Sequence, residues 1–222
     1  MAANLVLRGH PRSPRTQVVL VSLLQMGLVA DKDFQLETVD VQILKTPEWI
    51  ARHPFGQVPV LEDTTNQFEI YESRAIAKYA AAKFGSPLAP NPAADVRAYG
   101  QFEQACSVEA SDFTPPIRAL AFELYFKKAR SGQPADETQV QVQEELFHTA
   151  LEAYERILAK HAYVAGDQLT LADLFHLPFA TLVLEAGHAE ALVDGSLPNV
   201  ARWWKAISSL EAWATVVAGS KT

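Results

Sequence analysis

Ser13 is the first residue of this sequence that could do chemistry, in the stretch RGHPRSPRTQVV (8–19). It stands between a short apolar segment and a helical pattern, and Pro14 follows it directly. Serine before a helix, with proline at the first helical position, is a common helix start, so a capping role is the simplest interpretation. A serine hydroxyl at a helix N-terminus can also donate a hydrogen bond to an anion. This stretch alone favours the cap.

The segment FGQVPVLED (55–63) places a proline between two strand-like parts. Pro59 cannot donate to a strand ladder, which predicts a bend or a sheet edge. A cis Val58–Pro59 bond would turn the Val58 backbone outward, where it could pair with an extended ligand as an added strand. A rigid turn without a ligand is the alternative, and this segment does not decide between the two.

The segment YESRAI (71–76) places Glu72 and Ser73 directly before an apolar helical pattern. One interpretation is a helix cap with an acidic first turn. The other is a ligand site, in which Ser73 and the helix N-terminus bind a carboxylate while Glu72 accepts a hydrogen bond from an ammonium group. A ligand with both groups on one carbon, the amino-acid end of a molecule, would satisfy both residues.

The segments HPFGQVP (53–59) and ESRAI (72–76) closely resemble two motifs of the phi class of glutathione transferases, known chiefly from plants and also from fungi. LKTPEWIARHP resembles the family's His-Lys-Ser-Pro-Glu pattern. Two later segments, TPPIRALAFELYFKK and YVAGDQLTLADLFHLP, resemble the family's helical half. The resemblance therefore covers nearly the whole chain.

This resemblance implies the glutathione transferase fold, an α/β thioredoxin-like N-terminal domain followed by an all-α C-terminal helical domain. It implies by position that Ser13 contacts the glutathione sulfur and that Lys45 reaches the glycine carboxylate. Val58 would pair its main chain with the cysteinyl part, and Glu72 and Ser73 would take the γ-glutamyl end. The glutathione-binding residues implied as a set are Lys45, Gln57, Val58, Pro59, Glu72 and Ser73.

The chain differs from the family pattern at two points near Ser13 and Lys45. The family often has an arginine four or five residues after the serine, where this chain has Gln17 and Val18. Arg12 and Arg15 flank the serine instead, and whether they replace the missing arginine stays open here. Leu44 stands where the family often has a histidine before its lysine.

The predicted reaction is conjugation of the glutathione thiolate to small hydrophobic electrophiles, a detoxification reaction. A free thiol titrates near ~8.5, and lowering this pKa by ~2 units requires about 2.7 kcal/mol. A hydrogen bond from the Ser13 hydroxyl to a thiolate contributes ~1.5–3 kcal/mol. A helix N-terminus adds ~0.3–1 kcal/mol. Ser13 is therefore predicted to be a donor to the sulfur anion, neither a nucleophile nor a base.

A second, apolar site must hold the electrophile, and we expect it between the domains. Its predicted lining residues are Arg12, Phe113, Ile117 and Leu120. The family is dimeric, and Phe55 is a large apolar residue in a turn where a polar one is usual. Phe55 is therefore predicted to contact the partner in a homodimer.

Three other activities share parts of this pattern. A redox transferase that forms a mixed disulfide with glutathione needs a cysteine at the serine position, and residues 1–85 contain none. Peroxidase activity toward organic hydroperoxides needs no cysteine and can coexist with conjugation. A non-catalytic carrier of hydrophobic small molecules (a ligandin) would use the same pocket, so that alternative stays open.

The elements that must position these residues follow from hydrophobic periodicity and turn signals. The first ~85 residues predict the order β-α-β-α-β-β-α. A linker with three prolines, GSPLAPNPAAD, then ends this pattern, and only helical patterns follow it. The predicted domains are 1–84 and 95–222, joined by the linker 85–94. Thr170 and Asp173 have the spacing of a capping box for a buried helix, worth about 1 kcal/mol.

The composition excludes several classes for this 222-residue chain. Its net charge of −7 argues against a nucleic-acid surface. No apolar run approaches the ~18 residues of a membrane span, and no secretion signal is evident. The single cysteine, Cys106, cannot form an internal disulfide, and we expect a cytoplasmic protein. The six histidines show no paired metal spacing, so neither a metal nor a cofactor beyond the co-substrate glutathione is expected.

Overall fold

The computed structural model describes residues 4–221, which form two compact units. The first unit comprises Met1–Ala89 together with Glu211–Thr222, and the second comprises Pro90–Leu210. The domains predicted from sequence placed the last helix in the helical half. In the structure this helix packs against the first helix of the chain, so it belongs to the first unit.

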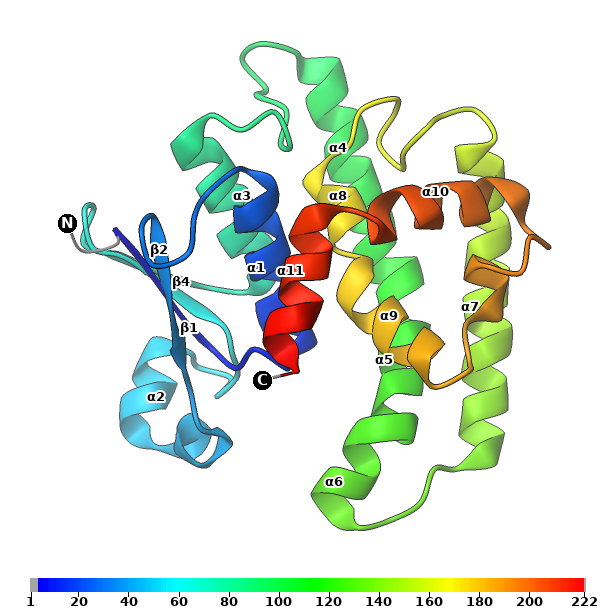
Figure 1. Cartoon of the computed structure of the whole chain (residues 1–222), viewed down its shortest axis with the longest axis horizontal. Helices are drawn as coiled ribbons and strands as arrows, with labels where there is room; N and C mark the ends of the chain where they lie inside the picture. The colour runs from blue at the N-terminus through cyan, green and yellow to red at the C-terminus, as the bar shows by residue number, and fades with distance from the viewer. Residues whose placement is uncertain (1–3, 222) are drawn as a thin grey trace. The chain divides into compact units, whose positions relative to one another are not determined.

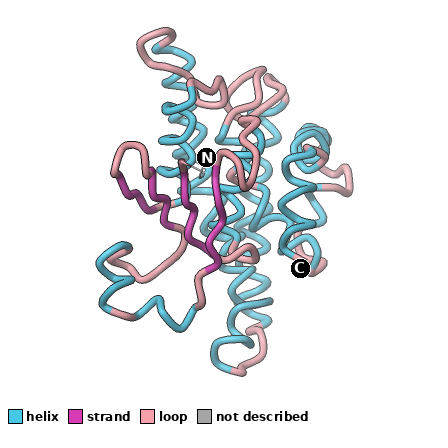
Figure 2. The backbone as a smooth tube through the Cα atoms, turned by 60° about the vertical axis from the view of Figure 1, so that its left-hand side comes forward, coloured by secondary structure: helices cyan, strands magenta, loops and turns pink. Residues whose placement is uncertain are grey.

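The first unit is built on a four-stranded mixed sheet with the strand order β2-β1-β3-β4 (Figure 2). β1 is parallel to β2, and β3 is antiparallel to both of its neighbours. The strands are β1 (Leu5–Gly9), β2 (Phe34–Thr38), β3 (Val60–Asp63) and β4 (Phe68–Tyr71). The predicted order of strands and helices in this half is confirmed.

Helices cover both faces of this sheet (Figure 1). α1 (Pro14–Gln25) and α3 (Ser73–Phe84) pack against each other on one face, which buries Leu5, Leu7 and Leu61. α2 (Pro47–Arg52) covers the other face, where Trp49 packs with Val60. The last helix, α11 (Glu211–Ser220), lies against α1. A 3-10 helix over Val41–Lys45, which the sequence pattern did not predict, leads into α2.

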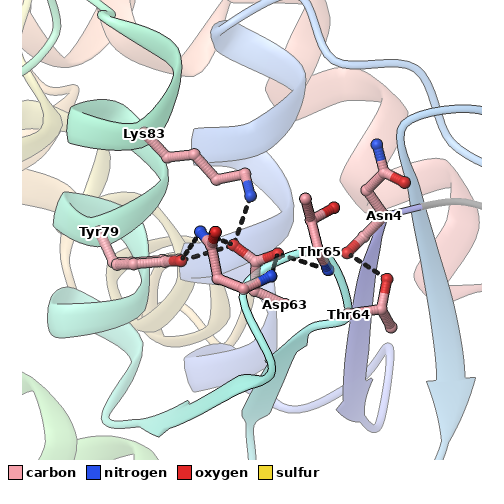
Figure 3. A network of polar contacts seen from close by, with 7 residues as sticks. Asn4, Asp63, Thr64, Thr65, Tyr79 and Lys83 are labelled. Atoms are coloured by element: carbon pink, nitrogen blue, oxygen red, sulfur yellow. Dashed lines mark hydrogen bonds and ion pairs between the residues drawn. The ribbon is translucent and has the colours of Figure 1, made fainter.

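A buried carboxylate ties α3 to the sheet (Figure 3). Asp63, the last residue of β3, is fully buried and accepts hydrogen bonds from the Tyr79 hydroxyl at 2.5 Å and the Asn66 amide at 3.0 Å. The Lys83 ammonium forms an ion pair with the same carboxylate. Burial alone raises the pKa of Asp63, but these donors outweigh it and hold the pKa at about 2. The network fixes the second half of α3 relative to β3.

The second unit is helical in the part that the structure describes. Its helices are α4 (Val96–Val108), α5 (Thr114–Ala121), α6 (Lys127–Ser131), α7 (Glu137–Leu158), α8 (Leu171–Leu174), α9 (Leu177–Glu185) and α10 (Pro198–Ser208), with a 3-10 turn at Glu190–Leu192. The segment from Thr114 does not begin a separate helix: α4, α5 and α6 form one continuous run, joined by π-helical turns at Glu109–Phe113 and Phe122–Phe126. The wider first π turn leaves room for Pro115 and Pro116, which lack N–H donors and crowd the preceding turn of an α-helix.

An aromatic cluster forms the centre of the second unit. Phe113 and Tyr154 pack around His176, and the Tyr154 hydroxyl lies 2.9 Å from His176 Nε2. The predicted capping box of Thr170 and Asp173 is confirmed. Asp173 also accepts hydrogen bonds at 3.0 Å from the Trp203 indole and from the Val164 backbone N–H. The Asp173 carboxylate therefore stabilises the packing of the second unit as well as the start of α8.

Candidate active site

The candidate site residues lie in segments that adjoin one edge of the sheet. β1, β2 and β4 run in the same direction, and register pairs Arg8 with Val60 and Val60 with Tyr71. The carboxyl ends of three strands therefore lie beside the start of β3. The segments that carry Ser13, Lys45, Val58 and Glu72 all adjoin this edge. The pairing places together four motifs that are far apart in the sequence.

Ser13 caps α1, as predicted. Its backbone is extended (φ −76°, ψ 120°), and its oxygen accepts from the Thr16 N–H at 3.5 Å. The loop before it is held by a hydrogen bond from the Gln17 amide to the Pro11 carbonyl at 3.0 Å. Gly9 permits a close approach here, because a Cβ at that position would lie 2.5 Å from Thr16 Oγ1. The cap uses an oxygen lone pair, so the Ser13 proton remains available to a further acceptor.

The segment before β3 presents an unpaired backbone. The Val58–Pro59 peptide is cis, as predicted. The Trp49 indole donates to the Gln57 carbonyl at 3.0 Å and holds the residue before Val58. Among residues 4–221, no backbone hydrogen bond joins the N–H or C=O of Val58 to the protein. An extended ligand can therefore pair with this residue as an added strand.

Glu72 and Ser73 form an N-terminus of α3 that has no side-chain cap. Ser73 is the first helical residue and is buried, while Glu72 occupies the N-cap position with a φ of +70°. A positive φ is unfavourable for a non-glycine residue and is often retained at ligand sites. The interpretation of this pair as an ordinary cap is therefore wrong. The N-terminus of α3, which no side chain caps, suits a carboxylate.

Lys45 lies at the end of the 3-10 helix, with its ammonium 3.5 Å from the Phe55 carbonyl. Gly56, the next residue of that loop, has a φ of +59°, and a Cβ there would lie 2.4 Å from the Leu44 carbonyl. Leu44 itself packs against the cluster around Trp49. The leucine that replaces the family's usual histidine thus serves packing.

The two arginines beside Ser13 point to different elements. The guanidinium of Arg15 donates to Gln57 Oε1 at 2.6 Å. Arg12 Nε donates to the Ser220 carbonyl at the end of α11, at 3.2 Å. Arg15 therefore faces the segment before β3. Arg12, which was predicted to line an electrophile site, is instead engaged by the last helix of the same unit.

The sequence pattern did not predict a role for His53, although it is the first residue of the HPFGQVP segment. Its ring is buried and stacks at a centroid distance of 4.8 Å on Tyr71, and its Nδ1 has no hydrogen-bond partner within the described residues. Burial lowers the pKa of His53, the Glu72 carboxylate opposes this shift, and the Arg15 charge reinforces it. The lowered pKa favours the neutral form of this imidazole, which lies within electrostatic reach of both charges.

Three residues predicted to line the electrophile site are core residues. The side chain of Phe113 is 1% exposed and packs within the aromatic cluster of the second unit, and Ile117 and Leu120 are fully buried. Ile117 and Leu120 lie in α5, which packs against α7 and α9, and Phe113 ends the π turn before α5, so these buried side chains offer no surface to a ligand. The prediction for these three is not supported by the structure.

Phe55 lies in the loop before Gly56 and is 65% exposed. An exposed phenyl ring is available for contact with another molecule.

Within the described range 4–221, no group of three or more His, Cys, Asp or Glu residues is arranged to hold a metal ion. No helix in that range is long and apolar enough to cross a membrane.

Two protein-family models match this chain. The glutathione S-transferase N-terminal domain matches residues 6–82, and the glutathione S-transferase C-terminal domain matches residues 113–211. The chain belongs to the glutathione transferase family. The predicted fold, a thioredoxin-like domain with a helical domain, is thereby confirmed, and the chain is a member of a transferase enzyme family.

Individual relatives place this glutathione transferase in the phi class, as its motifs predicted. Glutathione S-transferase PM239X14 of Arabidopsis thaliana is 47% identical over 205 residues, which cover 90% of this chain and 89% of the relative. Glutathione transferase F7 from Populus trichocarpa is 32% identical, with a TM-score of 0.87 over 97% of this chain and 99% of that one. Maize glutathione S-transferase I, solved with an atrazine glutathione conjugate, is 30% identical, with a TM-score of 0.86 over 99% of each chain.

Proposed function

We propose that this transferase joins the thiolate of glutathione to small hydrophobic electrophiles. One observation carries the proposal: Ser13, the unpaired backbone of Val58 and the uncapped N-terminus at Glu72 and Ser73 adjoin the same edge of the sheet. A tripeptide that is extended along this edge meets a donor for sulfur, a strand partner and a carboxylate site. The conjugate bound by the maize relative supports the same ligand class.

The proposed binding residues contact three different parts of glutathione. The γ-glutamyl end has a carboxylate and an ammonium on one carbon, which suit the N-terminus of α3 and the Glu72 carboxylate. The cysteinyl part pairs its backbone with Val58. The glycine carboxylate is assigned to Lys45, whose ammonium lies over the loop before Val58. We therefore retain Lys45, Gln57, Val58, Pro59, Glu72 and Ser73 as the proposed glutathione-binding residues.

The chemistry requires an ionised sulfur. Ser13 donates its hydroxyl proton in a hydrogen bond to the thiolate, and the N-terminus of α1 adds a favourable dipole, for a sum of roughly 2–4 kcal/mol. This sum matches the roughly 2.7 kcal/mol that a shift of ~2 pKa units requires. The thiol proton leaves to solvent. The sulfur then forms a bond to the electrophilic carbon, and the leaving group departs with its bonding electrons.

A substrate panel tests this proposal with the wild type and Ser13→Ala. The wild type is expected to conjugate chlorodinitrobenzene, with release of chloride. Ser13→Ala is expected to lower kcat/KM by roughly 10- to 100-fold, because it removes one hydrogen bond to a charged group. Cumene hydroperoxide is included because the same thiolate can reduce an organic hydroperoxide. If glutathione binds while neither reaction occurs, the protein is a carrier and the proposed activity is wrong.

We further propose that the protein is a homodimer in which Phe55 contacts the partner. The support is the high exposure of this ring in a loop held by Lys45 and by the packing of His53. An apolar ring fixed at the surface loses little conformational entropy when it is buried against a second copy.

A further inference from the structure

Arg15 contacts the glutathione site from a position that neither the capping pattern nor the family motifs assign. It is the second residue of α1, two positions after Ser13. Its Nη1 donates to the side-chain oxygen of Gln57 at 2.6 Å. This is a short, charge-assisted hydrogen bond between α1 and a segment 42 positions away.

The Gln57 residue is thereby held from two sides. Arg15 orients its side-chain amide, and the Trp49 indole holds its backbone carbonyl at 3.0 Å. Val58, whose backbone is proposed to pair with the cysteinyl part of glutathione, follows directly. A movement of Gln57 would also move the backbone of Val58. The contact between Arg15 and Gln57 therefore affects how the tripeptide is positioned.

The charge of Arg15 also acts within the site. It lies within electrostatic range of the buried His53 ring, which is also within range of the Glu72 carboxylate. The cation is placed in the first turn of the helix whose N-terminus is proposed to face the sulfur. By contrast, Arg12 is directed to the carbonyl of Ser220. The two flanking arginines therefore differ in what they can contribute to glutathione binding.

We propose that Arg15 is a positioning residue that links the sulfur end of the glutathione site, at Ser13, to the backbone-pairing end, at Gln57 and Val58. This inference rests on the proposed glutathione site. It predicts two separable effects. The planar guanidinium fixes Gln57 by its geometry, whereas the positive charge favours the thiolate through space.

Two substitutions separate these effects. Arg15→Gln removes both, so the KM for glutathione is expected to rise about threefold to tenfold and the thiol of bound glutathione to titrate at higher pH. Arg15→Lys retains the charge but not the planar donor group. It is expected to raise KM to a similar extent while leaving the thiol titration near that of the wild type.

A double-mutant cycle tests whether Arg15 acts through Gln57. If it does, Arg15→Gln combined with Gln57→Ala raises KM no more than the larger single effect. Arg52→Gln is the matched control, since it breaks another 2.6 Å contact, to Glu69 of β4, that involves neither Arg15 nor Gln57. This control is expected to leave KM and the thiol titration unchanged. Thermal melts of each variant confirm folding, and Arg15→Lys carries the test if Arg15→Gln does not fold.

The outcomes distinguish this inference from the proposed function. If the wild type lacks conjugating activity, the proposed function fails, and the dissociation constant of glutathione from calorimetry replaces KM in the cycle. If glutathione binding by Arg15→Gln stays within about twofold of the wild type, or the two single effects multiply in the double variant, the positioning role is overturned.

Discussion

Replacement of Asp63 by asparagine tests whether the buried network between β3 and α3 stabilises the first unit. The substitution keeps the size of the side chain but removes its charge. The new amide could still accept from the Tyr79 hydroxyl, but it would leave the Lys83 ammonium without its carboxylate partner. Lys83 is 18% exposed, so water would compensate it only in part.

The magnitude follows from the pKa of the carboxyl group. Asp63 titrates at about 2 in the folded protein against 3.8 as its ordinary value. This difference corresponds to about 2.4 kcal/mol of stability at neutral pH. Because the folded pKa is the lower one, this stability is fully present above pH 3.8 and is lost as the pH falls toward 2. Asp63→Asn is therefore expected to destabilise the protein by about 2–3 kcal/mol at pH 7.

Urea unfolding, followed by circular dichroism between pH 7 and pH 3, measures this effect. The wild type and Asp63→Asn should differ most at pH 7, and the difference should narrow below about pH 3.8, where the carboxyl group of the unfolded chain becomes protonated. Glu69→Gln is the control: it removes the same charge from the more exposed pair with Arg52 and is expected to cost less than about 1 kcal/mol. A loss below about 0.5 kcal/mol for Asp63→Asn, or a difference that does not change with pH, would show that the Asp63 charge does not stabilise the first unit.

Three further predictions concern other parts of the chain. Asp173→Ala is expected to cost at least about 3 kcal/mol in urea unfolding, well above a cap alone, because it leaves the buried Trp203 indole and other donors unpaired; a loss near 1 kcal/mol would show that only the cap matters. Phe55→Ala is expected to raise the dimer dissociation constant at least about tenfold in sedimentation equilibrium; an unchanged constant removes Phe55 from the interface. The folded pKa of His53 lies below its ordinary value of 6.5, so the contribution of His53 to stability is present above pH 6.5 and is lost as the pH falls. His53→Gln should therefore flatten the pH dependence of the melting temperature between pH 7 and pH 5. An unaltered slope would show that the His53 ring is not the source of this pH dependence.

Much of the first unit could be predicted because its signals are local. Proline and glycine mark the ends of its strands and helices, and apolar periodicity identifies the elements between them. The cap at Ser13 follows from Pro14, and, in the second unit, the capping box follows from the spacing of Thr170 and Asp173. Each of these features depends on residues within one or two turns, so the sequence alone is sufficient.

The remaining features depend on contacts between distant segments. Nothing local distinguishes Arg12 from Arg15, since each faces an element far away in the sequence. The same holds for Phe113, whose spacing suits a pocket wall and a core position equally well. The π turn before Pro115 and the burial of His53 also depend on tertiary packing. The type and spacing of a residue predict which face of a helix or strand it occupies. Its role depends on what packs against that face, which local sequence does not show.

The proposed role of Ser13 as a donor to the glutathione sulfur is tested by the pH titration of the thiol of bound glutathione in the wild type and in Ser13→Ala. The titration is read by the ultraviolet absorbance of the thiolate. We predict that the wild-type complex titrates roughly 2 units below the ~8.5 of a free thiol. In Ser13→Ala the titration should return upward by about 1–2 units, the equivalent of one charge-assisted hydrogen bond. A wild-type thiol that titrates near ~8.5, or a Ser13→Ala complex that titrates with the wild type, would contradict the assignment of Ser13 as the donor to the sulfur anion.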